Sequence, residues 1–98
     1  MRVIYHPDAE AELIEAAKFY EGRVPGLGAQ FLSGVDHAIS VISAAPERWA
    51  VIERDVRRCL IPRFPYGIYY RVLPEEIRVL AIKHHRRHPD YWRYRITP

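Results

Sequence analysis

The sequence predicts an α+β domain in which an antiparallel two-helix hairpin packs on one sheet. Apolar residues recur at helical spacing through the first half of the chain. β-Branched and aromatic residues dominate three short segments after residue 55, and prolines and glycines separate the segments. A chain of 98 residues can form one hydrophobic core but is too short for two. We therefore expect a single domain over residues 1–98.

The first two elements are a strand and a helix. Residues 2–5 (RVIY) are β-branched and aromatic, which predicts an N-terminal strand. Asp8 has the side chain of a helix cap, and Tyr20 belongs to an apolar stripe that continues almost to Arg23. We expect a helix of about 15 residues, capped by Asp8, whose glutamates, Glu12 among them, face water.

A turn and a second helix complete the expected hairpin. Proline and glycine in residues 24–28 (VPGLG) end the first helix, because proline cannot continue it and glycine permits a tight reversal. Phe31, Val35 and Ile42 then share one face of a second helix that must stop before Pro46. Such a short connection predicts that the two helices are antiparallel.

The second half of the chain predicts a three-stranded antiparallel meander that completes the sheet. Residues 56–61, 66–73 and 76–84 are rich in β-formers, and Pro74 with its acidic neighbours separates the last two as a hairpin. The last segment is apolar on both faces, so we expect both of its faces to be covered. Cys59, the only cysteine, should be a small buried residue on a strand.

Charge is distributed unevenly along the chain. Residues 1–53 contain four Lys/Arg and eight Asp/Glu, whereas residues 54–98 contain eleven and four, so net charges of −4 and +7 make up the total of +3. This asymmetry predicts a basic face for an anionic partner, either nucleic acid or an acidic protein surface. The alternative is that exposed arginines serve only solubility.

No stretch of the sequence resembles a membrane span or a signal peptide. The longest apolar runs fall well short of the roughly 20 residues that a bilayer span requires. The N-terminus lacks the apolar stretch and the small-residue cleavage site of a secretory signal. The sequence therefore predicts a cytoplasmic location and no membrane contact.

The segment 83–95 (KHHRRHPDYWRYR) carries the densest chemistry. Its histidines have no carboxylate or thiolate at a metal-ligand spacing, and Arg86 and Arg87 would repel a cation, so we expect neither a metal nor another cofactor. Trp92 is expected to pack against the sheet. Arginine forks suit phosphate oxygens, which makes a nucleic acid or another target a reasonable partner. The expected target-binding residues are Arg57, Arg58, Arg63, Lys83, Arg86 and Arg87.

RNA cleavage would need a further set of groups in the same segment. Attack by a ribose 2′-hydroxyl requires a base, an acid and cationic stabilisation of the developing charge. The candidate acid and base groups are His84, His85, His88 and Tyr91, with Arg86 and Arg87 as the stabilising cations.

Four segments together resemble the RelE/ParE superfamily of toxins from type II toxin–antitoxin systems, the plasmid stabilisation proteins. They are AEAELIEAAKFY, FLSGVDHAISVISAAPERW, VRRCLIPRFPYGIYYRV and IRVLAIKHHRRHPDYW. The resemblance covers nearly the whole chain and implies a small sheet with an N-terminal helical hairpin. It also implies a cognate antitoxin, which we expect to be acidic and partly disordered so that it suits the basic half of the chain.

The superfamily divides by target. RelE-like members cut messenger RNA on the ribosome, whereas ParE-like members inhibit DNA gyrase. Gly67 follows Tyr66 where ribonuclease members commonly carry an arginine, and the first helix has the length typical of ParE-like members. The resemblance therefore favours a ParE-like growth inhibitor. The alternatives are a metal-independent, RelE-like endoribonuclease and an inactive binding module with the toxin fold.

Overall fold

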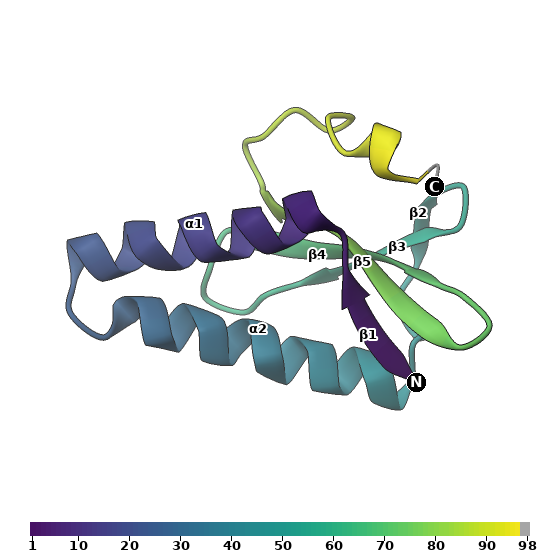
Figure 1. Cartoon of the computed structure of the whole chain (residues 1–98), viewed down its shortest axis with the longest axis horizontal. Helices are drawn as coiled ribbons and strands as arrows, with labels where there is room; N and C mark the ends of the chain where they lie inside the picture. The colour runs from purple at the N-terminus through teal and green to yellow at the C-terminus, as the bar shows by residue number, and fades with distance from the viewer. Residues whose placement is uncertain (97–98) are drawn as a thin grey trace.

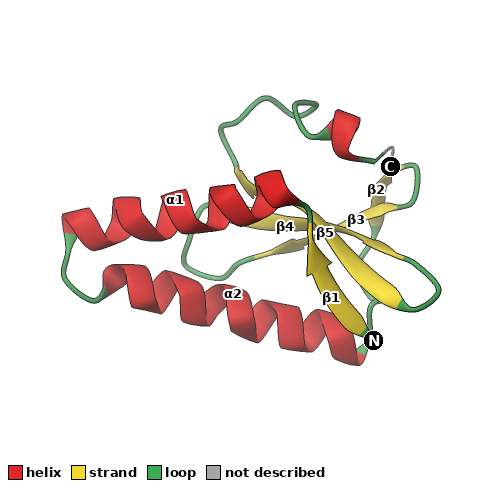
Figure 2. Cartoon of the chain, in the orientation of Figure 1, coloured by secondary structure: helices red, strands yellow, loops and turns green. Residues whose placement is uncertain are grey.

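The computed structural model of the chain describes residues 1–96. Two helices lie together on one side of a twisted sheet, and the C-terminal segment crosses the other side (Figures 1 and 2). Among the described residues, no helix is both long and apolar enough to cross a membrane. The elements in chain order are β1 (Arg2–Tyr5), α1 (Pro7–Arg23), α2 (Leu27–Ala44), β2 (Val51–Glu53), β3 (Val56–Leu60), β4 (Tyr66–Val72), β5 (Glu76–His84) and a 3₁₀ turn, η1 (Arg93–Arg95).

The sheet confirms the predicted fold class and adds one strand to it. Its order is β1-β5-β4-β3-β2, with β1 parallel to β5 and every other pair antiparallel. The short strand β2 was not predicted. It pairs with β3 through a tight turn in which Arg54 takes the left-handed conformation, with φ 53°. Glycine or asparagine normally marks such a turn, so the sequence carries no hairpin signal there.

Helix α1 is capped by a different residue from the one predicted. The His6 Nδ1 accepts a hydrogen bond from the Asp8 N–H at 3.0 Å, so His6 and not Asp8 is the N-cap. At the other end, the Glu21 carboxylate accepts from the backbone N–H groups of Gly26 and Gly28. These two bonds fix the hairpin turn, because they satisfy donors that the start of α2 leaves free.

The two faces of the sheet carry separate hydrophobic clusters. The helix face, which α1 and α2 cover, holds the larger one, and Cys59 is buried in it as expected. We call the opposite side the tail face, because residues 85–96, the tail, lie over it. Trp92 is 1% exposed and packs there on Tyr69, which confirms its expected packing. The tail-face cluster comprises Val56, Tyr69, Leu80, Ala81, Trp92 and Ile96.

Strand β5 is paired on both sides over only part of its length. β1 ends at Tyr5, opposite Val79, so the remainder of β5 has no neighbouring strand on that side. The register with β4 also shifts at Tyr69/Tyr70, which leaves Leu80 without a partner residue as a bulge. The outer edge of β5 from Leu80 to His84 therefore needs side chains to satisfy its backbone groups.

Candidate functional site

The unpaired edge of β5 is closed by Glu12 from α1 and Arg95 from the tail. The Glu12 Oε1 accepts from the Ile82 N–H at 3.0 Å, and the Arg95 guanidinium donates to the Leu80 carbonyl at 3.0 Å. Arg95 also donates to both oxygens of Glu12, at 2.9 and 3.0 Å. This bidentate pair is buried, with side-chain exposures of 4% for Arg95 and 13% for Glu12.

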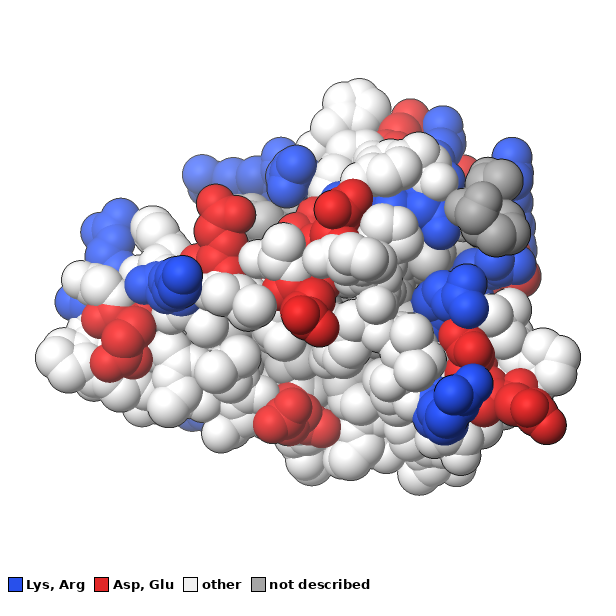
Figure 3. All heavy atoms as spheres, viewed as in Figure 1, with Lys and Arg blue, Asp and Glu red and all other residues white. Residues whose placement is uncertain are grey.

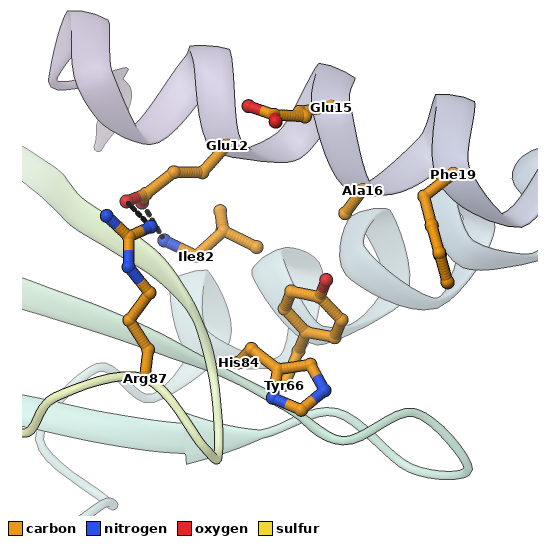
Figure 4. Close-up of a pocket in the computed structure, with 8 residues that line it drawn as sticks. All are labelled: Glu12, Glu15, Ala16, Phe19, Tyr66, Ile82, His84 and Arg87. Atoms are coloured by element: carbon orange, nitrogen blue, oxygen red, sulfur yellow. Dashed lines mark hydrogen bonds and ion pairs between the residues drawn. The ribbon is translucent and has the colours of Figure 1, made fainter.

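The expectation that Glu12 faces water is wrong. Its carboxylate is the centre of a network that also includes Arg87, whose guanidinium lies 3.6 Å away (Figure 4). The spacing of Ala9, Glu12 and Ala16 could have revealed this, since the two alanines are buried and Glu12 lies between them on the same helical face. No local pattern indicates Arg95 as its partner, because the two lie 83 positions apart in the chain.

A cleft of about 280 Å³ lies beside this network, between α1 and the end of β5. Phe19 contributes an apolar wall and is 54% exposed. The His84 ring meets the Tyr66 ring edge-on, with 5.1 Å between the ring centroids. The residues that line the cleft are Glu12, Glu15, Ala16, Phe19, Tyr66, Ile82, His84 and Arg87 (Figure 4).

The surroundings of the two aromatic titratable groups in the cleft favour their neutral forms. Burial, followed by the charges of His85, Arg86 and Lys83, lowers the pKa of His84. Its Nδ1 accepts a hydrogen bond from the Arg86 N–H, so the other ring nitrogen carries the hydrogen. Burial also raises the pKa of the Tyr66 hydroxyl. The cleft can therefore donate hydrogen bonds from a neutral imidazole and a neutral phenol.

The contacts of Tyr91 indicate a structural role. The Arg87 guanidinium lies 4.0 Å from the centre of its ring, and that of Arg95 lies 5.0 Å away. Its hydroxyl is buried near the Glu12 carboxylate without a well-formed hydrogen bond. Burial first, then Glu12, raises the pKa of Tyr91, so it stays protonated at neutral pH.

The other predicted site residues lie in different places. On the helix side, Arg57 donates to the backbone carbonyls of Glu47 and Trp49. Arg63 occupies the β3–β4 turn with φ 69°, and Arg86 is exposed in the turn after β5. The remaining three, Arg58, Lys83 and His85, line one hollow on the tail face. The structure thus brings His84 and Arg87 together on one side of β5, and Arg58, Lys83 and His85 together on the other.

Part of the uneven charge is neutralised by ion pairs within the molecule. Acidic and basic side chains are intermixed on the side seen in Figure 3. Glu12 and Glu53 from the acidic half pair with arginines of the basic half. The arginines that have carboxylate partners are thus not free to build the predicted basic face; they are Arg71, Arg78, Arg87, Arg93 and Arg95.

Comparison with known proteins identifies the class to which this arrangement belongs. The fold is similar to a chain in a solved structure described as the chromosomal ParDE toxin–antitoxin system from P. aeruginosa, with a TM-score of 0.75. The two share 19% sequence identity, over 86% of this chain and 95% of the other. A family model, the ParE toxin of the parDE type II toxin–antitoxin system, matches residues 3–89. The chain therefore belongs to the ParE toxin family.

Curated relatives agree with this assignment. The chain is 28% identical over 90 residues to Toxin ParE2 from two strains of Mycobacterium tuberculosis, CDC 1551/Oshkosh and ATCC 25618/H37Rv. The alignment covers 91% of this chain and 86% of each relative. The resemblance inferred from the four sequence segments is thus confirmed, and a toxin–antitoxin system implies a cognate antitoxin.

Proposed function

We propose that this chain inhibits growth by contact with a protein target, DNA gyrase, and that it acts in the cytoplasm. Membership of the ParE toxin family supports the toxin role. One observation favours contact over RNA cleavage: His84 and Arg87 line the α1 cleft, whereas His85 and Lys83 line a hollow on the opposite face. Cleavage requires a base, an acid and a stabilising cation around one phosphate.

The candidate catalytic groups on the α1 side of β5 are also engaged elsewhere. Arg87 is paired with Glu12, and the partly buried ring of Tyr91 packs against the Arg87 guanidinium. His84 already uses one ring nitrogen to accept from the Arg86 backbone. Arg87 and Tyr91 would have to leave these contacts before they could act on a phosphate, and this supports a toxin that works through binding.

We also propose an acidic, partly disordered antitoxin as the neutralising partner. The cleft beside α1 offers it an exposed apolar ring, Phe19, and the cation of Arg87 at 55% side-chain exposure. Arg58 and Arg86 add exposed positive charge at the same end of the sheet. An acidic segment that folds on binding could satisfy both the apolar and the cationic groups.

Two assays on the purified full-length chain test the gyrase proposal. We expect the chain to abolish DNA supercoiling by gyrase and to leave a cell-free translation system intact. Truncated messenger RNA in the translation assay would instead favour the ribonuclease alternative. In that case the Arg86→Ala/Arg87→Ala double variant should lose cleavage while retaining its fold. Activity in neither assay would contradict both gyrase inhibition and RNA cleavage. The remaining alternative would then be an inactive binding module.

A further inference from the structure

The tail covers only part of the tail face. Trp92 packs on Tyr69 with 5.3 Å between ring centroids, but the end of β3, the start of β4 and the end of β5 lie beyond it. Leu60 on this uncovered part is 54% exposed. A hollow of about 270 Å³ remains there, lined by Arg58, Leu60, Gly67, Tyr69, Lys83 and His85.

Gly67 forms the floor of this hollow. It lies directly between Leu60 on β3 and Lys83 on β5 in the sheet register. A Cβ atom at this position would come within 3.3 Å of Tyr69 Cε1 and 3.4 Å of Arg58 Cγ. The hollow therefore exists because a residue without a side chain occupies the middle position of the cross-strand row Leu60–Gly67–Lys83.

Lys83 projects into the hollow as a buried cation. The residue is 6% exposed, and its Nζ donates one hydrogen bond, to the His84 carbonyl at 3.1 Å. Among residues 1–96, no Asp or Glu forms an ion pair with Lys83 or with Arg58. This differs from Arg95, the other buried cation, which has the Glu12 carboxylate as its partner. A buried ammonium with unused donors is costly unless an anion approaches it.

The electrostatic environment of Lys83 also favours a bound anion. Burial, together with the charges of Arg58 and Arg87, lowers the pKa of Lys83, so its ammonium is less stable there than that of an exposed lysine. An anion in the hollow would reverse that effect, because it would offset the repulsion between the cations.

We propose that this hollow binds a phosphate group through the Lys83 ammonium, the Arg58 guanidinium and the His85 imidazole. Three donor-bearing groups with no acid among them suit a tetrahedral dianion better than a carboxylate, which carries one charge and two oxygens. The guanidinium can bind two phosphate oxygens at once, and the ammonium can bind a third. This inference does not depend on the gyrase proposal, because it concerns a different face of the sheet.

Titration of the full-length chain with inorganic phosphate at constant ionic strength, followed in ¹H–¹⁵N spectra, tests the inference. We expect shifts at the amides of Gly67, Lys83 and His85. Lys83→Met should weaken binding about tenfold or more, since a charge-assisted hydrogen bond is lost. Lys18→Met, which removes the same charge from the exposed side of α1, should change it less than about twofold.

Two further variants separate a built site from general attraction. Arg58→Gln alters an exposed side chain, so it tests the site even if Lys83→Met fails to fold. Gly67→Val keeps every charge but fills the floor, and it should also abolish binding. Binding that persists in Gly67→Val or in a folded Lys83→Met variant would overturn the inference. Equal binding of acetate, or no binding of phosphate, would overturn it too.

The source of the phosphate is resolved by three probes. Inorganic phosphate, a mononucleotide and a single-stranded oligonucleotide present the same group in different contexts. Comparable affinities for the first two identify a terminal phosphate as the ligand. Tighter binding of the oligonucleotide, lost in the same variants, identifies a nucleic-acid backbone.

Discussion

The helix face and the tail face of the sheet are covered by different means. On the helix face, two amphipathic helices bury a large cluster that includes Phe31 and Ile42, and few charges take part. On the tail face, the cluster is small and centres on Trp92, and ion pairs hold the tail in place. Several arginines of the basic second half, Arg71, Arg93 and Arg95 among them, therefore hold the toxin's own tail in place, whereas Arg58 and Lys83 have no carboxylate partner among the described residues.

Loss of the tail's main anchor should have the largest effect. Trp92 is fully buried, so Trp92→Ala should lower the free energy of unfolding by about 4 kcal/mol. Trp92→Phe is the matched control and should cost much less, because the indole N–H is buried without a hydrogen-bond partner. Urea denaturation measures both. Equal losses would show that the indole nitrogen matters in a way the geometry does not reveal.

Removal of the carboxylate that closes the β5 edge should come next. Glu12→Ala leaves the Arg95 guanidinium buried without its partner and frees the Ile82 N–H, so we expect a loss of about 3 kcal/mol. Glu15→Ala changes the same residue type on the next turn of α1, where the side chain is exposed, and should cost less than about 0.5 kcal/mol. Similar values for the two variants would contradict a central role for Glu12.

The helix face should respond to volume more than to charge. A Cβ at Gly28 would lie 2.6 Å from the Ala17 carbonyl oxygen, so Gly28→Ala should force α1 and α2 apart at a cost of about 2 kcal/mol. Gly22→Ala, with nothing within 4 Å, should instead stabilise the fold by about 0.5 kcal/mol. Thermal unfolding in a single buffer tests the pair. A neutral Gly28→Ala would mean that the hairpin packs more loosely than the structure indicates.

The helix face was the easier of the two to predict from sequence. Its helices repeat apolar residues every three or four positions, and β5 was predicted with its observed bounds, Glu76–His84. The tail face depends on contacts between distant residues, such as Glu12 with Arg95 and Glu53 with Arg93, which no local pattern encodes. For the same reason the candidate site residues could be recognised by type, but their division between two faces could not.

Acid should release the tail before it unfolds the helix face. The hydrogen bond from Arg71 lowers the pKa of Asp55, and the hydrogen bond from Tyr94 lowers that of Asp8. A carboxyl whose pKa is lower in the folded state stabilises the fold above its unfolded pKa of about 4 and loses that contribution as pH falls through the folded value. Arg71 also donates to the Ile96 carbonyl, so protonation of Asp55 loosens the end of the tail.

Fluorescence of a Trp49→Phe variant would follow this release, because Trp92 is then the only tryptophan. Below pH 4 we expect its emission to change at a higher pH than the helical circular dichroism signal. Asp55→Asn should shrink the difference between the two transitions, and it should cost under about 1 kcal/mol at neutral pH, since its side chain is half exposed. If the two transitions coincide in the Trp49→Phe variant, the tail stays in place until the hydrophobic cluster beneath the helices unfolds. The two faces would then unfold as one unit.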